Sequence, residues 1–198
     1  MARPSKFDRE QAVEFAMNAF WKEGYEANSV KALSEKLGIT RSSFYNAFGD
    51  REQLFDEALA LYMRDSPDKA FREVAPGISI KALFTDTFRT VCKARSADTE
   101  ARGCLVVNGV AELCGTHDTI GPKLQAAMLA NLKRFETLLG WAVDNGELDP
   151  KTDVHALALA METLLVGLNV LSKLVQDEGE LWRTASTSLR ALNLLEET

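Results

Sequence analysis

The sequence has few of the residues that most metal and redox sites need. It contains 3 cysteines and 2 histidines among 198 residues. Cys92, Cys104 and Cys114 are odd in number, and their spacings of 12 and 10 fit neither a disulfide framework nor a C-x-x-C metal site. The two histidines, His117 and His155, are too few and too scattered for a dedicated zinc site, although Cys114 and His117, three positions apart, could share a metal. We therefore expect free thiols, no metal and no cofactor.

Motifs of the common enzyme classes are missing as well. The sequence has no G-x-S-x-G, no phosphate-binding P-loop, no H-E-x-x-H and no dinucleotide-binding glycine pattern. Two histidines leave little choice of a general base, so only chemistry by carboxylates stays open. We expect a protein that is not an enzyme.

Long apolar runs are also scarce. No run approaches the roughly 20 apolar residues that a transmembrane helix needs, and the start, MARPSKFDRE, lacks the apolar core of a signal peptide. The composition, 46% hydrophobic and 26% charged, is that of an ordinary globular protein, and the length suffices for one large or two small domains. We therefore expect a cytoplasmic protein with no membrane partner.

The periodicity that is present is helical throughout, and no alternating strand pattern, repeat or low-complexity tract interrupts it. Capping and turn residues divide the chain into about nine helices. We place them at 8–23, 29–37, 41–48, 50–65, 79–95, 102–114, 121–145, 152–177 and 180–194. The predicted fold class is all-α, with a small unit at 1–50, a fourth helix at 51–65 as connector and a larger domain at 66–198.

The predicted helix at 41–48 combines an apolar and a polar face. At 100° per residue, Phe44 and Phe48 lie on one side, whereas Ser42 and Asn46 lie opposite and Tyr45 lies beside them. The aromatic side chains would anchor the helix and turn a small polar surface outward. A solvated outer face is the simpler interpretation, but a purely structural helical protein would leave this polar cluster without a purpose.

The preceding helix favours a functional interpretation. Residues 29–37, the turn at 38–40 and residues 41–48 have the lengths of a helix-turn-helix, whose second helix enters the DNA major groove. Short serines allow close approach, Asn46 suits base edges, Arg41 suits guanine or phosphate, and Arg51 suits a phosphate. The candidate DNA-contacting residues are Arg3, Lys6, Ser29, Lys31, Thr40, Arg41, Ser42, Ser43, Tyr45, Asn46 and Arg51.

The stretch VKALSEKLGITRSSFYNAFGDREQLFDEAL resembles the helix-turn-helix signature of the tetracycline-repressor (TetR) family of bacterial transcriptional regulators, and the similarity covers about residues 7 to 60. The resemblance implies three DNA-binding helices, a connecting helix and a C-terminal domain that dimerises and binds an effector, with repression as the default. The start MARPSKFD resembles a basic arm, which would place Arg3 and Lys6 at a minor groove or flanking phosphates, although a disordered tail is equally compatible. Many members differ at Ser42 and Asn46, so the operator sequence does not transfer.

Charge is divided unevenly along the chain. Residues 1–51 hold 8 Lys and Arg against 7 Asp and Glu, whereas residues 52–198 hold 15 against 22. Because an acidic chain is repelled by DNA, its positive groups must gather on one face to bind double-stranded DNA. We expect Lys36 to join the arginines and lysines named above on that face, and operator affinity to fall steeply with salt. Replacing Arg51 by Ala should lower the salt slope by about 1.

The segment 152–177 carries more apolar residues than one inward face needs. An entirely internal core is one interpretation. We favour a two-fold interface in which this segment and 180–194 form a four-helix bundle with their mates, helped by the small residues Ala160 and Gly167. A homodimer would hold two recognition helices about 34 to 36 Å apart, the spacing that a palindromic operator requires.

The segment GCLVVNGVAELC, 103–114, places Asn108 and Glu112 one turn apart in apolar surroundings. They are either paired within a core or orient a small organic effector. The expected pocket residues are Phe84, Phe88, Cys104, Leu105, Asn108, Gly109, Glu112, Met128 and Trp141. A ligand favouring a splayed dimer would release the operator, with the fourth helix as the lever.

The GCL start of this segment also resembles family members in which a cysteine senses electrophiles or oxidants. Cys104 is the matching residue, and a position near a helix N-terminus would favour its reactive thiolate. Burial would instead make the thiol inert. Thiol-based sensing through Cys104 is thus the alternative to reversible effector binding.

Overall fold

Nine α-helices and one short 3₁₀ helix, without a strand, form the part of the chain that the structure describes, residues 8–74 and 77–197 of a computed structural model. The elements are α1 (Arg9–Glu23), α2 (Val30–Leu37), α3 (Arg41–Phe48), α4 (Arg51–Asp65), η1 (Lys69–Arg72), α5 (Ile80–Ser96), α6 (Leu105–Leu113), α7 (Ile120–Asp144), α8 (Val154–Leu171) and α9 (Glu178–Ala191). The predicted all-α class is confirmed. The predicted contacts of Arg3 and Lys6 lie outside the described residues.

The first four helices begin at the caps that the sequence indicates. Asp8, Ser29, Thr40 and Asp50 each accept hydrogen bonds from backbone N–H groups in the following first turn. Gly38 closes α2 in the left-handed conformation, with φ of 67° and ψ of 29°, a backbone that glycine adopts without strain. The chain therefore passes from α2 to α3 in a turn of three residues.

Two predicted helices are shorter in the structure. The predicted start of α6 at residue 102 is wrong, because Ala101 and Gly103 have φ of 53° and 69°, which no right-handed helix accommodates. The predicted extension of α8 to residue 177 is also wrong. The chain turns at Ser172, whose hydroxyl donates to the carbonyl of Asn169, and Asp177 then caps α9. The helix η1 was not predicted.

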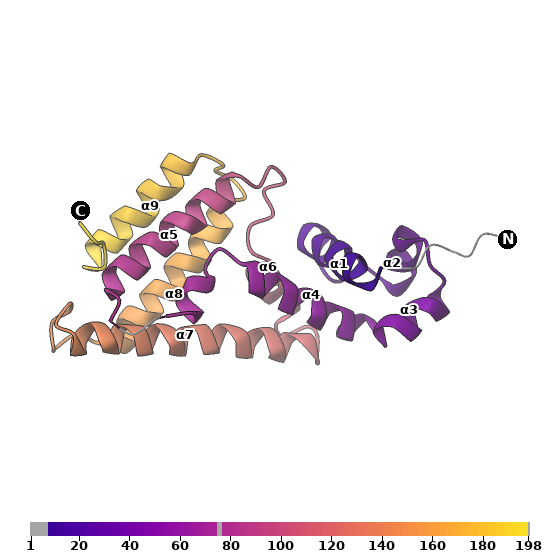
Figure 1. The fold of residues 1–198 in the computed structure, drawn as a ribbon, viewed down its shortest axis with the longest axis horizontal. Helices are drawn as coiled ribbons and strands as arrows, with labels where there is room; N and C mark the ends of the chain where they lie inside the picture. Colours follow the sequence, from indigo (N-terminus) through magenta and orange to yellow (C-terminus); the bar gives the residue numbers. More distant parts are fainter. Residues whose placement is uncertain (1–7, 75–76, 198) are drawn as a thin grey trace.

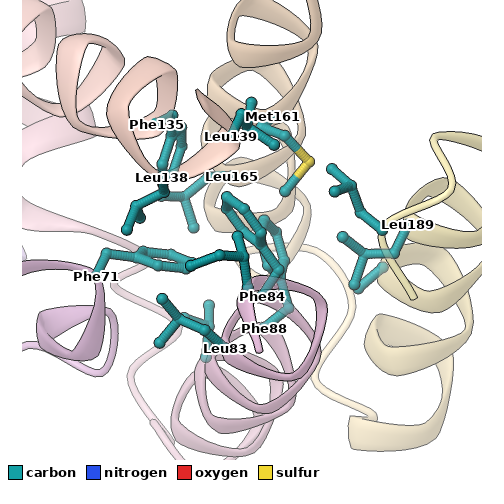
Figure 2. Close-up of a cluster of buried hydrophobic side chains, with 14 of the residues drawn as sticks. Phe71, Leu83, Phe84, Phe88, Phe135, Leu138, Leu139, Met161, Leu165 and Leu189 are labelled. Atoms are coloured by element: carbon teal, nitrogen blue, oxygen red, sulfur yellow. The ribbon is translucent and has the colours of Figure 1, made fainter. Parts of the chain in front are cut away.

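Two hydrophobic clusters hold the helices together. The first joins the buried residues of α1–α4 with those of α6 and the start of α7. The second joins η1, α5, the later part of α7, α8 and α9 around an aromatic group in which Phe71 lies 5.2 Å from Phe84 and 5.0 Å from Phe135 between ring centroids (Figure 2). α7 contributes to both clusters and runs along one side of the molecule, with α1–α3 at one end and α9 at the other (Figure 1).

α8 keeps an apolar surface outside both clusters. Its 18 residues have a mean hydropathy of 1.7 and only 28% of them are buried, so by length and composition this helix suffices to cross a membrane. His155, Glu162 and Asn169 interrupt the stretch, and a single helix of this composition also occurs in the cores of globular proteins, so it does not indicate a membrane. Leu159 and Val170 are 45% and 49% exposed, Leu174 just beyond the helix is 82% exposed, and open space surrounds Gly167. This surface is available to another molecule.

Candidate functional site

α3 presents a polar outer face on a buried aromatic base. Phe44 and Phe48 are 0% and 2% exposed, and their ring centroids lie 5.2 Å apart. Ser42, Tyr45 and Asn46 are exposed, as are Arg41 and Ser43. The helix lies at one end of the molecule, beside α2 (Figure 1). The aromatic face of α3 is packed against the protein and its polar face is exposed to solvent. A helix inserted into a DNA groove requires this arrangement.

Other candidate DNA contacts lie at the surface around α3 with local partners. Ser29 and Thr40 cap α2 and α3, and the hydroxyl of Thr40 lies 3.0 Å from that of Ser43. Lys31 pairs with Glu35 at 3.9 Å and Lys36 with Glu23 at 2.6 Å. Because exposed ion pairs contribute about 0 to 1 kcal/mol, these lysines could exchange their partners for phosphates at little cost.

Arg51 differs from the other candidates. Its guanidinium lies 3.8 Å from the ring centroid of Tyr25, donates to the carbonyl of Tyr25 at 3.4 Å and lies 3.4 Å from the carboxylate of Glu26. The side chain is only 23% exposed. Burial raises the pKa of the Tyr25 phenol, and the positive charge of Arg51 opposes that rise. This placement favours an anchoring role for Arg51 over a phosphate contact.

A small, partly open cavity lies among α4, η1, α6, α7 and α8. Its volume is about 50 Å³, room for a few water molecules at most. Val106, Met128 and Leu165 contribute to its apolar wall, whereas Tyr62 and Cys104 contribute polar atoms. Any larger ligand must therefore push the surrounding helices apart.

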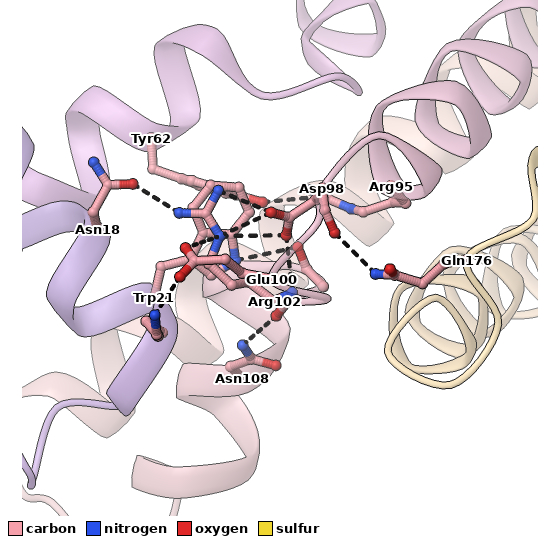
Figure 3. Close-up of polar contacts among 11 residues, drawn as sticks. Asn18, Trp21, Tyr62, Arg95, Asp98, Glu100, Arg102, Asn108 and Gln176 are labelled. Atoms are coloured by element: carbon pink, nitrogen blue, oxygen red, sulfur yellow. Dashed lines mark hydrogen bonds and ion pairs between the residues drawn. The ribbon is translucent and has the colours of Figure 1, made fainter.

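Hydrogen-bonding groups line the same cavity. Asn131 Nδ2 donates to Glu162 Oε2 at 2.6 Å. Burial raises the pKa of Glu162 above its usual range, and the hydrogen bond from Asn131 only partly offsets this. Burial also raises the pKa of the Tyr62 phenol, which accepts a hydrogen bond from Arg95 Nη2 at 2.9 Å (Figure 3). Arg95 Nε in turn donates to Asn169 Oδ1 at 2.6 Å. The cavity thus combines an apolar wall with several polar groups, the combination that small-molecule sites use.

The structure does not bring the nine predicted pocket residues around one cavity. Cys104 and Met128 line it. Phe84, Phe88 and Leu105 are 0%, 0% and 2% exposed and fill the two hydrophobic clusters instead. Buried aromatic residues of a solid core and of a pocket wall have the same sequence pattern, so periodicity could not separate them.

The remaining predicted pocket residues have other surroundings. Gly109 packs against Leu124, where an added Cβ would lie 3.0 Å away, and Trp141 is 46% exposed on the surface of α7. Asn108 donates to the carbonyl of Arg102 at 2.8 Å. Glu112 accepts from two backbone N–H groups in the turn after α1. These polar groups of α6 are therefore paired within the fold.

Tyr62, Asn131, Glu162 and Asn169 are cavity residues that the sequence analysis missed. For Glu162 a signal existed, because it is the one acidic residue within the apolar stretch that forms α8. A carboxylate in such a stretch needs a partner or a function.

The junction between α5 and α6 is fastened to α1. Trp21 Nε1 donates to the carbonyl of Gly103 at 3.2 Å, and the guanidinium of Arg102 lies 3.8 Å from the indole ring centroid (Figure 3). Arg102 also donates to Asn18 Oδ1 at 2.8 Å and pairs with Asp98 at 3.0 Å. Burial alone would raise the pKa of Asp98, but the hydrogen bonds from Arg102 hold it below its usual value.

The three cysteines are free thiols in different surroundings. Burial raises the pKa of Cys92 to about 12, and Cys114 lies 3.5 Å from the carbonyl of Gly121. Cys104 is half-buried at the N-cap of α6 and makes no side-chain capping bond there. His117 Nδ1 accepts from the N–H of Ile120 at the start of α7. Within residues 8–74 and 77–197, no group of three or more potential metal ligands occurs.

Two family descriptions match this chain. Residues 13–58 match the bacterial regulatory proteins of the tetR family, and residues 80–187 match the tetracyclin repressor-like C-terminal domain. The first match spans α2 and α3, and the second spans most of the helices around the second hydrophobic cluster.

Individual proteins are similar over nearly the whole chain. The HTH-type transcriptional repressor ComR of Escherichia coli strain K12 is 26% identical, over 95% of this chain and 90% of its own length. The uncharacterised HTH-type regulator YezE of Bacillus subtilis strain 168 is 29% identical, over 98% of this chain and 100% of its own. A cysteine variant of the TetR family regulator CifR, solved in complex with 26-base-pair operator DNA, is 31% identical with a TM-score of 0.83, over 96% of this chain and 99% of its own.

Proposed function

The chain belongs to the tetracycline-repressor (TetR) family, and on that premise we propose that it is a homodimeric repressor that releases a palindromic operator when a small organic effector enters the cavity. Membership makes it a DNA-binding transcriptional regulator with a helix-turn-helix, not an enzyme. The same role supports the proposal that it acts in the cytoplasm, where its DNA target would lie. The exposed polar face of α3 on its buried aromatic base is the observation that carries the proposal.

In the proposed complex, α3 enters the major groove. Arg41, Ser42 and Asn46 face base edges, while Lys31 and Lys36 at the same end of the molecule contact phosphates. Fluorescence anisotropy with DNA from upstream of the protein's own gene tests this at several salt concentrations. We expect tighter binding to that DNA than to random DNA of equal length. Equal affinity for both would overturn the operator proposal.

We propose that a second copy of the chain covers the apolar surface of α8. Leu159 and Val170 provide apolar area, and the open space at Gly167 lets another helix approach closely. Sedimentation should give a dimer for the wild type and a monomer for Leu159→Glu. Leu129→Glu is the matched control, because Leu129 is 57% exposed on α7 and outside the proposed interface. A wild-type monomer at micromolar concentration would contradict the proposal.

The cavity is the proposed effector site. At about 50 Å³ it is too small for an organic molecule of ordinary size, so binding would displace α4, α6 or α8. A ligand that binds the displaced arrangement more tightly shifts the population away from the operator-binding spacing, with α4 as the lever. Operator and ligand affinities must then be coupled reciprocally. Mass spectrometry of denatured protein would identify a co-purified ligand, and a ligand that leaves operator affinity unchanged would refute the switch.

Thiol-based sensing through Cys104 is a second candidate. Its half-buried sulfur lines the cavity at the N-terminus of α6, where a reactive molecule that enters the cavity would meet it. Iodoacetamide labelling followed by mass spectrometry should modify Cys104 faster than the deeply buried Cys92. Equal rates would remove this candidate, and Cys104→Ser shows whether peroxide releases the operator through that sulfur.

A further inference from the structure

The carboxylate of Glu112, at the end of α6, lies against the turn between α1 and α2. Oε2 accepts from the N–H of Tyr25 at 3.0 Å and Oε1 accepts from the N–H of Glu26 at 2.9 Å. A Cβ on Gly24 would lie 2.8 Å from the same carboxylate, so the close approach depends on glycine at that position. Each oxygen thus holds one backbone group of the turn that leads into the helix-turn-helix.

Further contacts hold the same turn from other sides. The ring of Tyr25 has the guanidinium of Arg51 at 3.8 Å, and the ring centroid of His117, from the segment after α6, at 5.1 Å. The start of α6 is fastened to α1 through Trp21 and Arg102, as described above. α6 is therefore attached to the DNA-binding helices near both of its ends.

Between those attachments, α6 forms part of the cavity wall. Cys104, Val106 and Val107 face the cavity, and Glu112 lies five residues beyond Val107 on the same helix. If the nine residues of α6 shift as one unit, a displacement at the cavity end reaches the other end, where Glu112 lies. Among the described residues, α6 is the one element that both lines the cavity and accepts hydrogen bonds from the backbone of this turn through a carboxylate.

We infer that Glu112 is the positioning residue that fixes the orientation of α1–α3 on the rest of the protein, and through it the separation of the two recognition helices in the dimer. Two hydrogen bonds to two different oxygens prevent the rotation that a single bond would allow, and the negative charge strengthens both. An occupant of the cavity would act on operator binding through this contact. The inference rests on the operator-binding dimer proposed above.

The test is the dependence of binding on half-site spacing. Inserting one base pair between operator half-sites changes their separation by about 3.4 Å and their relative rotation by about 35°. Wild-type protein, with firmly held recognition helices, should lose affinity steeply on such DNA. Glu112→Gln keeps the size of the side chain but places an amide NH₂ against a backbone N–H, so one hydrogen bond is lost. It should bind the native spacing more weakly, by up to about tenfold, because the loosened recognition helices must be ordered on binding, and it should show a smaller spacing penalty than wild type.

Glu147→Gln provides a matched control. Glu147 likewise accepts from two backbone N–H groups, those of Ile80 and Lys81, both at 3.0 Å, but at the start of α5. The control should lower thermal stability yet retain the wild-type spacing penalty. A wild-type penalty in Glu112→Gln would overturn the inference and reduce Glu112 to a structural cap.

A second measurement needs no operator. Hydrogen exchange at the amides of Tyr25 and Glu26 should be slow in the wild type and faster in Glu112→Gln, whereas Glu147→Gln should leave it unchanged. Equal exchange in wild type and Glu112→Gln would overturn the inference even if operator binding behaves as proposed. Absence of any operator preference in the wild type would instead be a failure of the proposed function, and the exchange data would still decide whether Glu112 holds the turn.

Discussion

Anchoring and DNA recognition by α3 can be separated with two substitutions on opposite faces of the helix. Phe44→Ala removes a ring that is 0% exposed and lies 5.2 Å from the ring of Phe48 between centroids. Truncating a buried phenylalanine costs about 3–5 kcal/mol, because the transfer free energy is lost and a cavity remains. A domain stable by about 5–15 kcal/mol would lose a large part of its margin.

Asn46→Ala changes the exposed face instead. A surface truncation of this kind alters the free energy of unfolding by about 0.5 kcal/mol or less. If Asn46 contacts a base edge, operator affinity falls by about 1–3 kcal/mol, which corresponds to roughly five- to 150-fold in Kd. The two variants should therefore lose different properties. Phe44→Ala should lose stability, and Asn46→Ala should lose operator affinity while keeping its stability.

The assay is urea unfolding followed by circular dichroism, together with fluorescence anisotropy on the operator at fixed salt. Wild type and Asn46→Ala should share an unfolding midpoint, whereas the midpoint of Phe44→Ala should fall sharply. Wild-type operator affinity in Asn46→Ala would remove Asn46 from the interface. Full stability in Phe44→Ala would refute the argument that aromatic packing holds α3 in place.

Three further predictions test other parts of the structure. Arg51→Ala should lower thermal stability and leave the salt slope of operator binding unchanged, because the guanidinium lies over Tyr25; a slope that falls by about 1 would assign it to a phosphate instead. Hydrogen bonds hold the pKa of Glu147 below its usual value although burial opposes them, so its stabilisation is present above the ordinary pKa of about 4.3 and is lost as pH falls through the lower, folded-state value. Glu147→Gln should accordingly cost about 1.5–3 kcal/mol in urea unfolding at pH 7 and progressively less as the pH falls below about 4.3, and a cost that does not change with pH would contradict the lowered pKa. Gly103→Ala should lower the free energy of unfolding by more than about 1 kcal/mol, since φ is 69° and the new Cβ would lie 2.8 Å from a backbone carbonyl of α8. Gly115→Ala is the control, because Gly115 also has positive φ but open space around it, so this variant measures the backbone strain alone.

Local signals predicted the DNA-binding helices well. Ser29, Thr40 and Asp50 each cap a helix at the position where the sequence places one, and Gly38 has the left-handed backbone expected of it. Each of these features depends on residues at most four positions apart. The outward placement of Ser42 also follows from local helical geometry alone.

The cavity and the partner of Glu112 could not be predicted in the same way, because their contacts join distant parts of the chain. Asn131 and Glu162 in the cavity are 31 positions apart, and Glu112 and Tyr25, outside it, are 87 apart. The sequence showed that Glu112 needed a partner, but not whether the partner was a ligand or a backbone. Phe84 shows the same limit, since its hydrophobic pattern fits a pocket wall and a filled core equally well.

The first hydrophobic cluster has a practical consequence for building hybrid regulators. Leu105, Val106 and Leu113 of α6 and Leu124 of α7 share that cluster with Leu54 and Phe55 of α4. A chimera cut after the helix-turn-helix would expose these side chains to water. The transplanted segment would also lose about half of the buried apolar residues against which it packs. Exchanging DNA specificity with another repressor therefore calls for a graft of the outer face of α3, with everything beneath it left in place.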